Sequence, residues 1–322
     1  MSGIRTDAKL QEIIDIVSVL GEKGAASALR IKESTVRRAV RQANEHELRP
    51  SKIRLPKVLE EINERFSESE LKAISKGARI SPGLPSVPVA KFDGDCVTIG
   101  VFSDTHIGSI YTDNSHIFKA FHEFDKEKVD FIVHCGDVVE GFSHREGHVY
   151  EVTHIGYEAQ KETAIRIFEH LPAPMYMIDG NHDRWYLKRS GAYVVKDIAD
   201  KLKSVTYLGS DEGDISLGSS ATLKLWHGED GNSYAISYRM QKIVESLTGG
   251  TKPNILIAGH VHKMIYLFLR HIHCIGAGAI QMQSKWMRGK RIESHTGFWI
   301  IKAWVNETGI GKFSSTWYPL YV

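Results

Sequence analysis

Long apolar runs are missing from this chain. No stretch of the 322 residues approaches the ~18 consecutive apolar residues that a membrane-spanning helix needs. Asp7, Lys9, Glu12 and Asp15 interrupt the first apolar stretch, which therefore lacks the core of a secretory signal peptide. We expect no membrane association.

Cysteine is also scarce. Cys96, Cys135 and Cys274 each lie in an apolar, strand-like run, and no CxxC pair occurs. Because disulfide frameworks and cysteine metal sites use paired thiols, we expect these three to be reduced core residues. This cysteine usage is typical of a cytoplasmic protein.

Net charge is small, at +2, but it is unevenly distributed. Residues 1–60 hold 12 Lys and Arg against 8 Asp and Glu, whereas the remainder of the chain is slightly acidic. Prolines gather at 81–88 (SPGLPSVP), which is typical of a linker. We expect an N-terminal module at 1–50, a helical segment and proline-rich linker at 51–92, and a catalytic domain at 93–322.

The N-terminal module has apolar residues at helical spacing, which predict three short helices between residues 10 and 41. The third helix would expose three arginines, Arg37, Arg38 and Arg41. This pattern is typical of a helix-turn-helix, whose second helix lies in a DNA major groove. The alternative is a three-helix bundle with a solvated basic face that mediates protein contacts, such as a homodimer or a replication or repair partner.

Five short motifs rich in metal ligands follow in a fixed order. They are Ser103-Asp104-Thr105-His106, Gly136-Asp137, Gly180-Asn181-His182-Asp183, His227-Gly228 and Gly259-His260-Val261-His262. Most follow an apolar run typical of a buried strand; the runs are Val97–Ser103, Phe131–Cys135, Met175–Ile178, Leu223–Trp226 and Ile255–Ala258. Because open α/β sheets bind ligands at the carboxyl ends of their strands, we expect these side chains to form one two-metal hydrolytic centre.

The order of the motifs resembles the calcineurin-like metallophosphoesterase superfamily, whose motifs run DxH, GDxx, GNH[DE], H and GHxH, over residues 95–305. Ser103–Ser109 and Gly136–Gly141 are similar to the nuclease subunit of double-strand-break repair complexes and to the proofreading small subunit of archaeal family D DNA polymerase. His227–Lys263 is similar to phage and prophage phosphoesterases. The resemblance implies an α/β fold, a four-layer αββα sandwich, beside the small all-α helix-turn-helix domain.

The resemblance also implies a ligand set for two metal ions. Asp104, His106 and His262 would bind one ion; Asn181, His227 and His260 would bind the other; Asp137 would bridge both. Mixed nitrogen and oxygen ligands suit Mn²⁺, Fe²⁺ or Zn²⁺ better than Mg²⁺, and the nuclease resemblance favours two Mn²⁺. A metal-bridging hydroxide would attack phosphorus in line. His182 would protonate the leaving oxygen, and Asp183 would orient its imidazole.

Phosphoprotein phosphatases of this superfamily carry an arginine directly before the GNH motif, where this chain has Asp179. That activity is therefore not expected, and a nucleic-acid diester is favoured. Glu140 stands where relatives carry Asp, Asn or His.

Candidate nucleic-acid contacts outside the N-terminal module are Arg145, near three histidines, and Lys285 and Arg288, which flank Trp286. Cations interleaved with an aromatic residue are typical of single-strand binding surfaces, but also of ordinary basic loops. Arg184 and Trp185, which follow GNHD, would either contact a nucleotide or pack at a helix start.

We expect a two-metal-dependent phosphodiesterase, and among such enzymes we favour a DNA nuclease. One alternative is a phosphodiesterase that acts on a cyclic nucleotide or a nucleotide-linked small substrate. Another is a DNA-binding regulator with a vestigial phosphoesterase fold, against which the intact ligand set argues.

Overall fold

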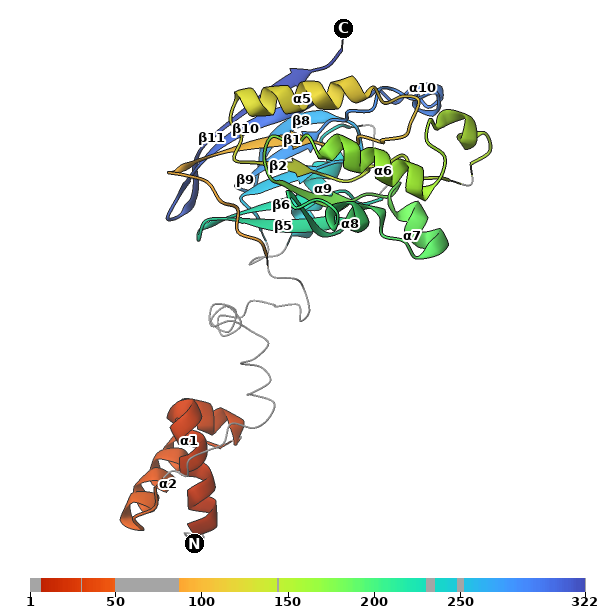
Figure 1. Cartoon of the computed structure of the whole chain (residues 1–322). Coiled ribbons are helices and arrows are strands. Elements are labelled where there is room, and N and C mark those ends of the chain that lie inside the picture. The colour runs from red at the N-terminus through yellow and green to blue at the C-terminus, as the bar shows by residue number, and fades with distance from the viewer. Residues whose placement is uncertain are drawn as a thin grey trace. The chain divides into compact units, whose positions relative to one another are not determined.

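The computed structural model describes residues 7–29, 31–49, 87–143, 145–229, 235–247 and 252–321. The chain divides into two compact units, Met1–Pro82 and Gly83–Val322 (Figure 1). The helical segment and proline-rich linker were expected at 51–92, and residues 51–86 of this region lie outside the described residues.

Residues 7–29 and 31–49 of the N-terminal unit are mainly helical. Its helix α1 (Asp7–Ala28) is broken at Gly21, where φ is 68°, a left-handed conformation that glycine adopts without steric cost. Helix α2 (Glu33–Glu45) buries Val36, Ala39 and Ala43 in a small core shared with α1. The expected three helical stretches are therefore present, two of them joined at the kink.

The larger unit contains two mixed sheets. The strands of the first sheet are β1 (Cys96–Phe102), β2 (Phe131–His134), β3 (Met175–Asp179), β4 (Val205–Ser210), β10 (Gly297–Asn306) and β11 (Gly309–Pro319). Their order is β11-β10-β1-β2-β3-β4. Strands β1 to β4 are parallel, β10 is antiparallel to β1, and β11 is antiparallel to β10.

The strands of the second sheet are β5 (Glu212–Leu217), β6 (Ala221–Trp226), β7 (Ile255–Ala258), β8 (Met264–Leu269) and β9 (Ile272–Ala277). Their order is β5-β6-β7-β9-β8, with β6, β7 and β9 parallel. Strands β4 and β5 were not among the apolar runs noted in the sequence, because both have half-exposed residues.

The two sheets pack face to face, with helices on both outer faces. In β7, Ile255 and Ile257 point into the core between the sheets, while Leu256 and Ala258 face the outer layer. Burial on both faces explains why this strand is apolar throughout. The helices of the unit are α5 (Asn114–Lys126), α6 (Tyr157–Phe168), α7 (Arg184–Ser190), α8 (Val194–Ala199), α9 (Tyr238–Ser246) and α10 (Lys285–Gly289).

Helices α5, α6 and α8 pack on the first sheet, and α9 packs on the second (Figure 1). The expected four-layer αββα sandwich is thus confirmed. Within the described residues, no helix combines the length and apolar character that crossing a bilayer requires. Cys135 and Cys274 are buried free thiols, whereas Cys96 is only half-buried.

Candidate metal centre

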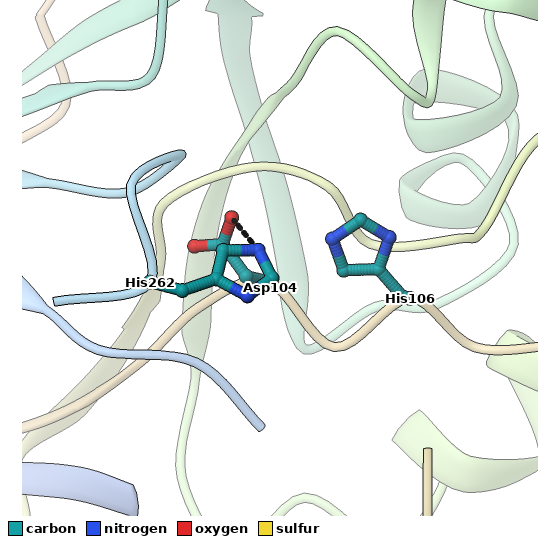
Figure 2. Close-up of side chains that lie close together, drawn as sticks. All are labelled: Asp104, His106 and His262. Atoms are coloured by element: carbon teal, nitrogen blue, oxygen red, sulfur yellow. Dashed lines mark ion pairs between the residues drawn. The ribbon is translucent and has the colours of Figure 1, made fainter. Parts of the chain in front are cut away.

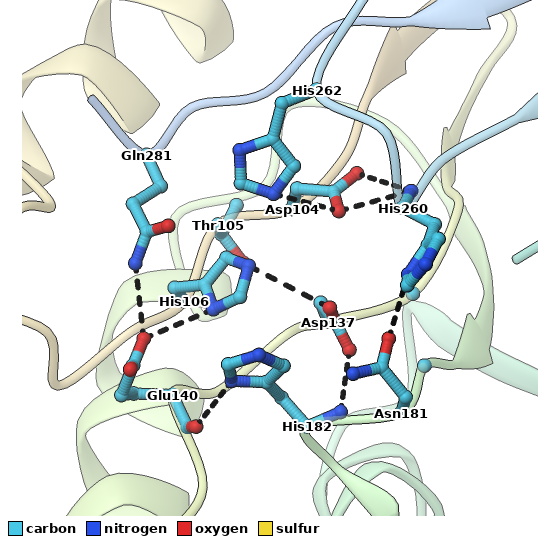
Figure 3. A network of polar contacts seen from close by, with 12 residues as sticks. Asp104, Thr105, His106, Asp137, Glu140, Asn181, His182, His260, His262 and Gln281 are labelled. Atoms are coloured by element: carbon cyan, nitrogen blue, oxygen red, sulfur yellow. Dashed lines mark hydrogen bonds and ion pairs between the residues drawn. The ribbon is translucent and has the colours of Figure 1, made fainter. Parts of the chain in front are cut away.

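The five motifs follow the carboxyl ends of β1, β2, β3, β6 and β7, and their side chains converge. Figure 3 labels residues of four of these motifs, whose side chains point toward one another. Two groups of side chains there match the expected ligand sets, and in each group the ligand atoms lie within 4.8 Å of one another. They are Asp104, His106 and His262, and Asp137, His227 and His260.

The first group is built around Asp104 (Figure 2). Its Oδ1 lies 3.2 Å from His262 Nε2, and the backbone N–H of His260 donates to both carboxylate oxygens, at 3.1 and 3.2 Å. Ser103 Oγ donates to Oδ2 at 2.5 Å. These donors hold the carboxylate of Asp104 in position, while His106 faces the same space from the other side.

Asp137 lies between the two groups. Its Oδ2 is 3.2 Å from His227 Nε2 and 3.6 Å from His106 Nε2, so one oxygen faces a histidine of each set. This is the position expected for the bridging carboxylate. Asn181 Oδ1 joins the second group, at 3.2 Å from His227 Nε2 and 2.8 Å from His260 Nδ1.

Hydrogen bonds on the far side of two imidazoles leave their inner nitrogens for a metal. His227 Nδ1 lies 2.6 Å from the carbonyl of Cys135, and His106 Nδ1 lies 3.0 Å from Glu140 Oε2. Metal-binding histidines use such outer partners to set the tautomer and ring orientation. His106 Nε2 is buried without a hydrogen-bond partner. A missing partner at a buried nitrogen, together with the Asp, His and Asn donors, fits a divalent metal site.

The backbone of the ligand residues is strained. Five of them have positive φ: Asp104 at 50°, His106 at 43°, Asp137 at 52°, His260 at 72° and His262 at 51°. Each non-glycine residue in this region costs on the order of 1–3 kcal/mol and persists only where surrounding structure enforces it. Gly180 shows how tight the packing is, because a Cβ there would meet Asp137 Oδ1 at 2.2 Å.

The carboxylates make the site attractive to positive charge. Burial opposes the charge of His106, but its hydrogen bond to Glu140 and the nearby carboxylates raise its pKa to about 9. Burial likewise opposes the charge of His227, yet Asp137 raises its pKa to about 10. Despite burial, His227 and its neighbours hold the pKa of Asp137 well below its usual range. The same field favours divalent cations.

Glu140 is buried and joins three polar side chains. Its Oε2 contacts His106 Nδ1 and accepts from Gln281 Nε2 at 3.0 Å, and its Oε1 lies 2.9 Å from His148 Nε2. Gln281 lies in the loop after β9, outside every motif, so motif analysis did not identify it. His134 was also missed: it bonds Thr105 Oγ1 at 2.9 Å and the N–H of Gly136 at 3.2 Å, and so joins the first two motif loops.

The expectation that Asp183 orients His182 is wrong. The carboxylate of Asp183 accepts backbone N–H groups of Val138, Val139 and Gly180 at 3.1, 2.9 and 2.8 Å. Burial and the charge of Asp137 raise its pKa to about 7. Asp183 therefore joins two motif loops, since a carboxylate accepts several backbone donors at once.

The imidazole of His182 has other partners. Its Nδ1 lies 2.8 Å from the carbonyl of Glu140, and its ring packs on Trp185 with centroids 3.9 Å apart. His182 also lies edge-on to His106, at 4.5 Å. Burial lowers the pKa of His182. The ring lines the cavity together with members of both ligand groups.

A cavity of about 430 Å³ opens over the ligand groups, and its lining includes His106, Asp137, Asn181, His182, His260 and His262. Arg145 also lines it, in an ion pair with Glu151. Lys285 and Arg288 are exposed on α10, and Trp286 between them lines the cavity. Among the neighbouring histidines, His148 is buried against Glu140, and His144 lies outside the described residues.

Arg184 does not reach the cavity. It is buried and forms ion pairs with Asp179, Asp211 and Glu229, at 3.1, 2.6 and 2.8 Å. The alternative of packing at a helix start is correct for this residue. Trp185, in contrast, both packs on His182 and lines the cavity.

The arginines of α2 belong to the other unit. Arg37, Arg38 and Arg41 are exposed and line one depression together with Glu33 and Ser34. Arg37 forms ion pairs with Glu22, at 2.9 Å, and with Glu33. Because Arg37 is paired with carboxylates, Arg38 and Arg41 are the better candidates for contact with DNA phosphates.

With this geometry established, comparison with known proteins decides the family. A model described as calcineurin-like phosphoesterase matches residues 97–264, just over half of the chain. The chain belongs to the calcineurin-like phosphoesterase family. Its fold, ligand groups and family together support metal-dependent phosphoester hydrolysis. No curated protein matches the chain.

Three solved structures are among those similar to this chain. A novel archaeal phosphodiesterase is 20% identical, with 69% of this chain and 100% of that chain covered and a TM-score of 0.40. A predicted phosphoesterase from Streptococcus pneumoniae is 14% identical, with coverage of 70% and 100% and a TM-score of 0.36. Zinc-complexed Vps29 from Entamoeba histolytica is 13% identical, with coverage of 69% and 99% and a TM-score of 0.37.

Proposed function

We propose that this calcineurin-like phosphoesterase is a two-metal-dependent DNA nuclease. The observation that supports it best is the cavity, whose lining combines members of both metal-ligand groups with two tryptophans, Trp185 and Trp286. Aromatic rings beside a phosphate-reactive centre suit a substrate that carries bases. The three free thiols fit a reducing compartment such as the cytoplasm.

The two ligand groups would hold the two ions, with Asp137 shared and Asn181 completing the second set. Two divalent ions at such a site activate water and neutralise charge on the phosphate. The donor set suits Mn²⁺, with Fe²⁺ or Zn²⁺ as alternatives. Asp137 keeps its place because its other oxygen, Oδ1, accepts the backbone N–H of His182 at 2.8 Å.

His182 would act on the leaving group. Its Nδ1 is held by the carbonyl of Glu140, so its Nε2 is the nitrogen left to face a bound phosphate. As an imidazolium, the ring would donate the proton on Nε2 to the leaving alkoxide while its Nδ1–H stays bonded to the carbonyl of Glu140, and it would regain a proton from solvent. The packing of its ring on Trp185 restricts rotation and keeps Nε2 aimed into the cavity.

The cations around the cavity favour a diester over a monoester. A monoester dianion is commonly held by an arginine clamp, but Arg184 is tied to three carboxylates. Of the described lining residues, Arg145 is the one Lys or Arg, and it is paired with Glu151. A phosphodiester carries a single negative charge, so its binding does not need an additional arginine of this kind.

The N-terminal unit would add affinity for DNA. The kink at Gly21 and helix α2 give it the helical stretches of a helix-turn-helix, with Arg38 and Arg41 exposed on α2. Arginines on the exposed face of such a helix contact phosphates or guanine edges. Homodimerisation or binding of a replication or repair protein is the alternative use of this face.

A substrate panel tests the proposal. Single- and double-stranded DNA, bis-p-nitrophenyl phosphate and cyclic AMP are each incubated with the protein and Mn²⁺, beside the Asp137→Asn variant. We expect the wild type to cleave DNA and the Asp137→Asn variant not to cleave it. Turnover of cyclic AMP or the chromogenic diester without any DNA cleavage would favour the small-substrate alternative. No turnover of any substrate would favour a DNA-binding regulator.

A further inference from the structure

We propose that the substrate of this centre is single-stranded DNA, whose unpaired bases bind to an apolar and aromatic wall of the metal cavity. This inference rests on the proposed nuclease function and names its substrate. Three observations carry it: the composition of the wall, the hydrogen bonds that join its segments, and the single cation, Arg145, among the described residues of the cavity lining.

The wall lies in the same cavity as the ligand groups. Its apolar and aromatic members are Tyr111, Val261, Trp286, Met287 and Ile292. They share one lining with His106, Asp137 and His182, so a phosphate at the ligand groups places its neighbouring base near this wall. Every base has a flat π-face that stacks on an aromatic ring, so such a wall binds nucleotides without reading their sequence.

Trp286 is the member best placed to stack on a base. It lies on the short helix α10, where Ser284 Oγ accepts the N–H of Met287 at 3.2 Å. Met287 is 6% exposed and anchors the helix, whereas Trp286 remains 46% exposed although it lines the cavity. A large aromatic ring held by an anchored helix and open to solvent loses little entropy when a base stacks on it.

The wall continues into a rim built from three chain segments. Ile110 N–H donates to the carbonyl of Glu151 at 2.9 Å, and Met282 N–H donates to the carbonyl of Tyr111 at 3.0 Å. Segments 108–112, 147–155 and 282–287 are therefore neighbours. They carry a set of exposed apolar side chains: Ile110, Val149, Tyr150, Ile155, Met282 and Trp286. Apolar exposure of this kind next to a cavity marks a binding surface.

Duplex DNA suits this surface poorly. A duplex presents its phosphates and hides the faces of its bases, so proteins bind it through many Lys and Arg contacts. Here Arg145, the one Lys or Arg among the described lining residues, is paired with Glu151. Lys285, Arg288, Lys290 and Arg291 are exposed on and just after α10 but do not line the cavity. A cavity of about 430 Å³ is of ligand size, so it suits one unpaired nucleotide. Duplex DNA would have to unpair at a further cost.

The test compares one labelled oligonucleotide, single-stranded and as a blunt duplex, with the full-length chain and Mn²⁺. KM and kcat are measured for the wild type, Trp286→Ala, Trp286→Tyr and Phe268→Ala. Phe268 is the matched control, because it is an exposed aromatic residue of β8 that does not line the cavity. Circular dichroism shows whether each variant is folded.

The wild type is expected to cleave the single strand at least ~10-fold more efficiently than the duplex, because a duplex must first unpair. Trp286→Ala should raise KM for the single strand roughly 5- to 150-fold, the loss of one stacked base, while Trp286→Tyr restores most of the affinity. Phe268→Ala should match the wild type.

Two results would overturn the inference while leaving the nuclease proposal in place. They are equal efficiency on single strand and duplex, and an unchanged KM in folded Trp286→Ala. A rise in KM of the same size in Phe268→Ala would also count against it, since the effect would not be local to the cavity. Turnover of bis-p-nitrophenyl phosphate with no cleavage of either DNA would instead reject the nuclease function itself.

Discussion

Replacing Asp137 by asparagine is the sharpest test of the metal centre, because the two side chains have the same shape and differ in one atom. Asp137 uses both oxygens: Oδ1 accepts the N–H of His182 at 2.8 Å, and Oδ2 lies between His227 Nε2 and His106 Nε2, at 3.2 and 3.6 Å. Asparagine has one oxygen and one NH₂ group, so it can meet only one of these requirements.

Both orientations of the amide are unfavourable. If its oxygen keeps the bond to His182, the NH₂ group faces the ligand atoms and cannot bind a cation. If the amide is reversed, two N–H donors meet at the backbone of His182. A buried hydrogen bond to a charged acceptor is worth about 1.5–3 kcal/mol, or roughly 10- to 150-fold, before the loss of the shared ligand is counted. We therefore expect a rate loss of at least ~10²-fold.

The assay measures Mn²⁺-dependent hydrolysis of bis-p-nitrophenyl phosphate, together with calorimetric titration of Mn²⁺. Asp200→Asn is the matched control, because Asp200 is an exposed carboxylate paired with Lys196 at 2.6 Å. The control should behave as the wild type. Full activity of Asp137→Asn in the presence of EDTA would refute the two-metal reasoning.

Three further predictions follow from the geometry. His182→Ala should keep both Mn²⁺ ions in a calorimetric titration while turnover falls about 10²–10⁴-fold, the usual contribution of a general acid; loss of one ion would show that His182 is a ligand. Glu140→Gln should weaken Mn²⁺ binding about 10- to 100-fold, because Glu140 is the hydrogen-bond partner that orients His106, and excess Mn²⁺ should restore turnover. Glu127→Gln, which removes a carboxylate paired with Lys302, is the control, and an unchanged Mn²⁺ dependence of Glu140→Gln would contradict the role of Glu140. Arg38→Gln with Arg41→Gln should reduce the slope of log K against log salt by about 0.7–0.9 per lost phosphate contact, measured by anisotropy with a labelled oligonucleotide, whereas an equal slope would show that α2 does not bind DNA.

The sequence by itself was sufficient for the fold class and for the order of the ligands. Each motif follows a strand that is apolar because both of its faces are buried, as β7 shows. In parallel strands the carboxyl ends meet at one edge, so residues as distant as Asp104 and His262 could be placed together without coordinates. The order of the motifs and the apolar pattern of the strands before them can both be read from a single sequence.

Side-chain partners outside the motifs were decided by the tertiary structure alone. Asp183 bonds to backbone amides instead of His182, and Arg184 is buried among three carboxylates. Glu140 reaches His106, and Gln281 arrives from the loop after β9 to bond Glu140. Such contacts depend on which rotamer the packing allows and on segments far apart in the chain. Motif spacing therefore located the candidate metal centre, whereas only the packed structure showed how the candidate ligands are held and which side chains line the cavity.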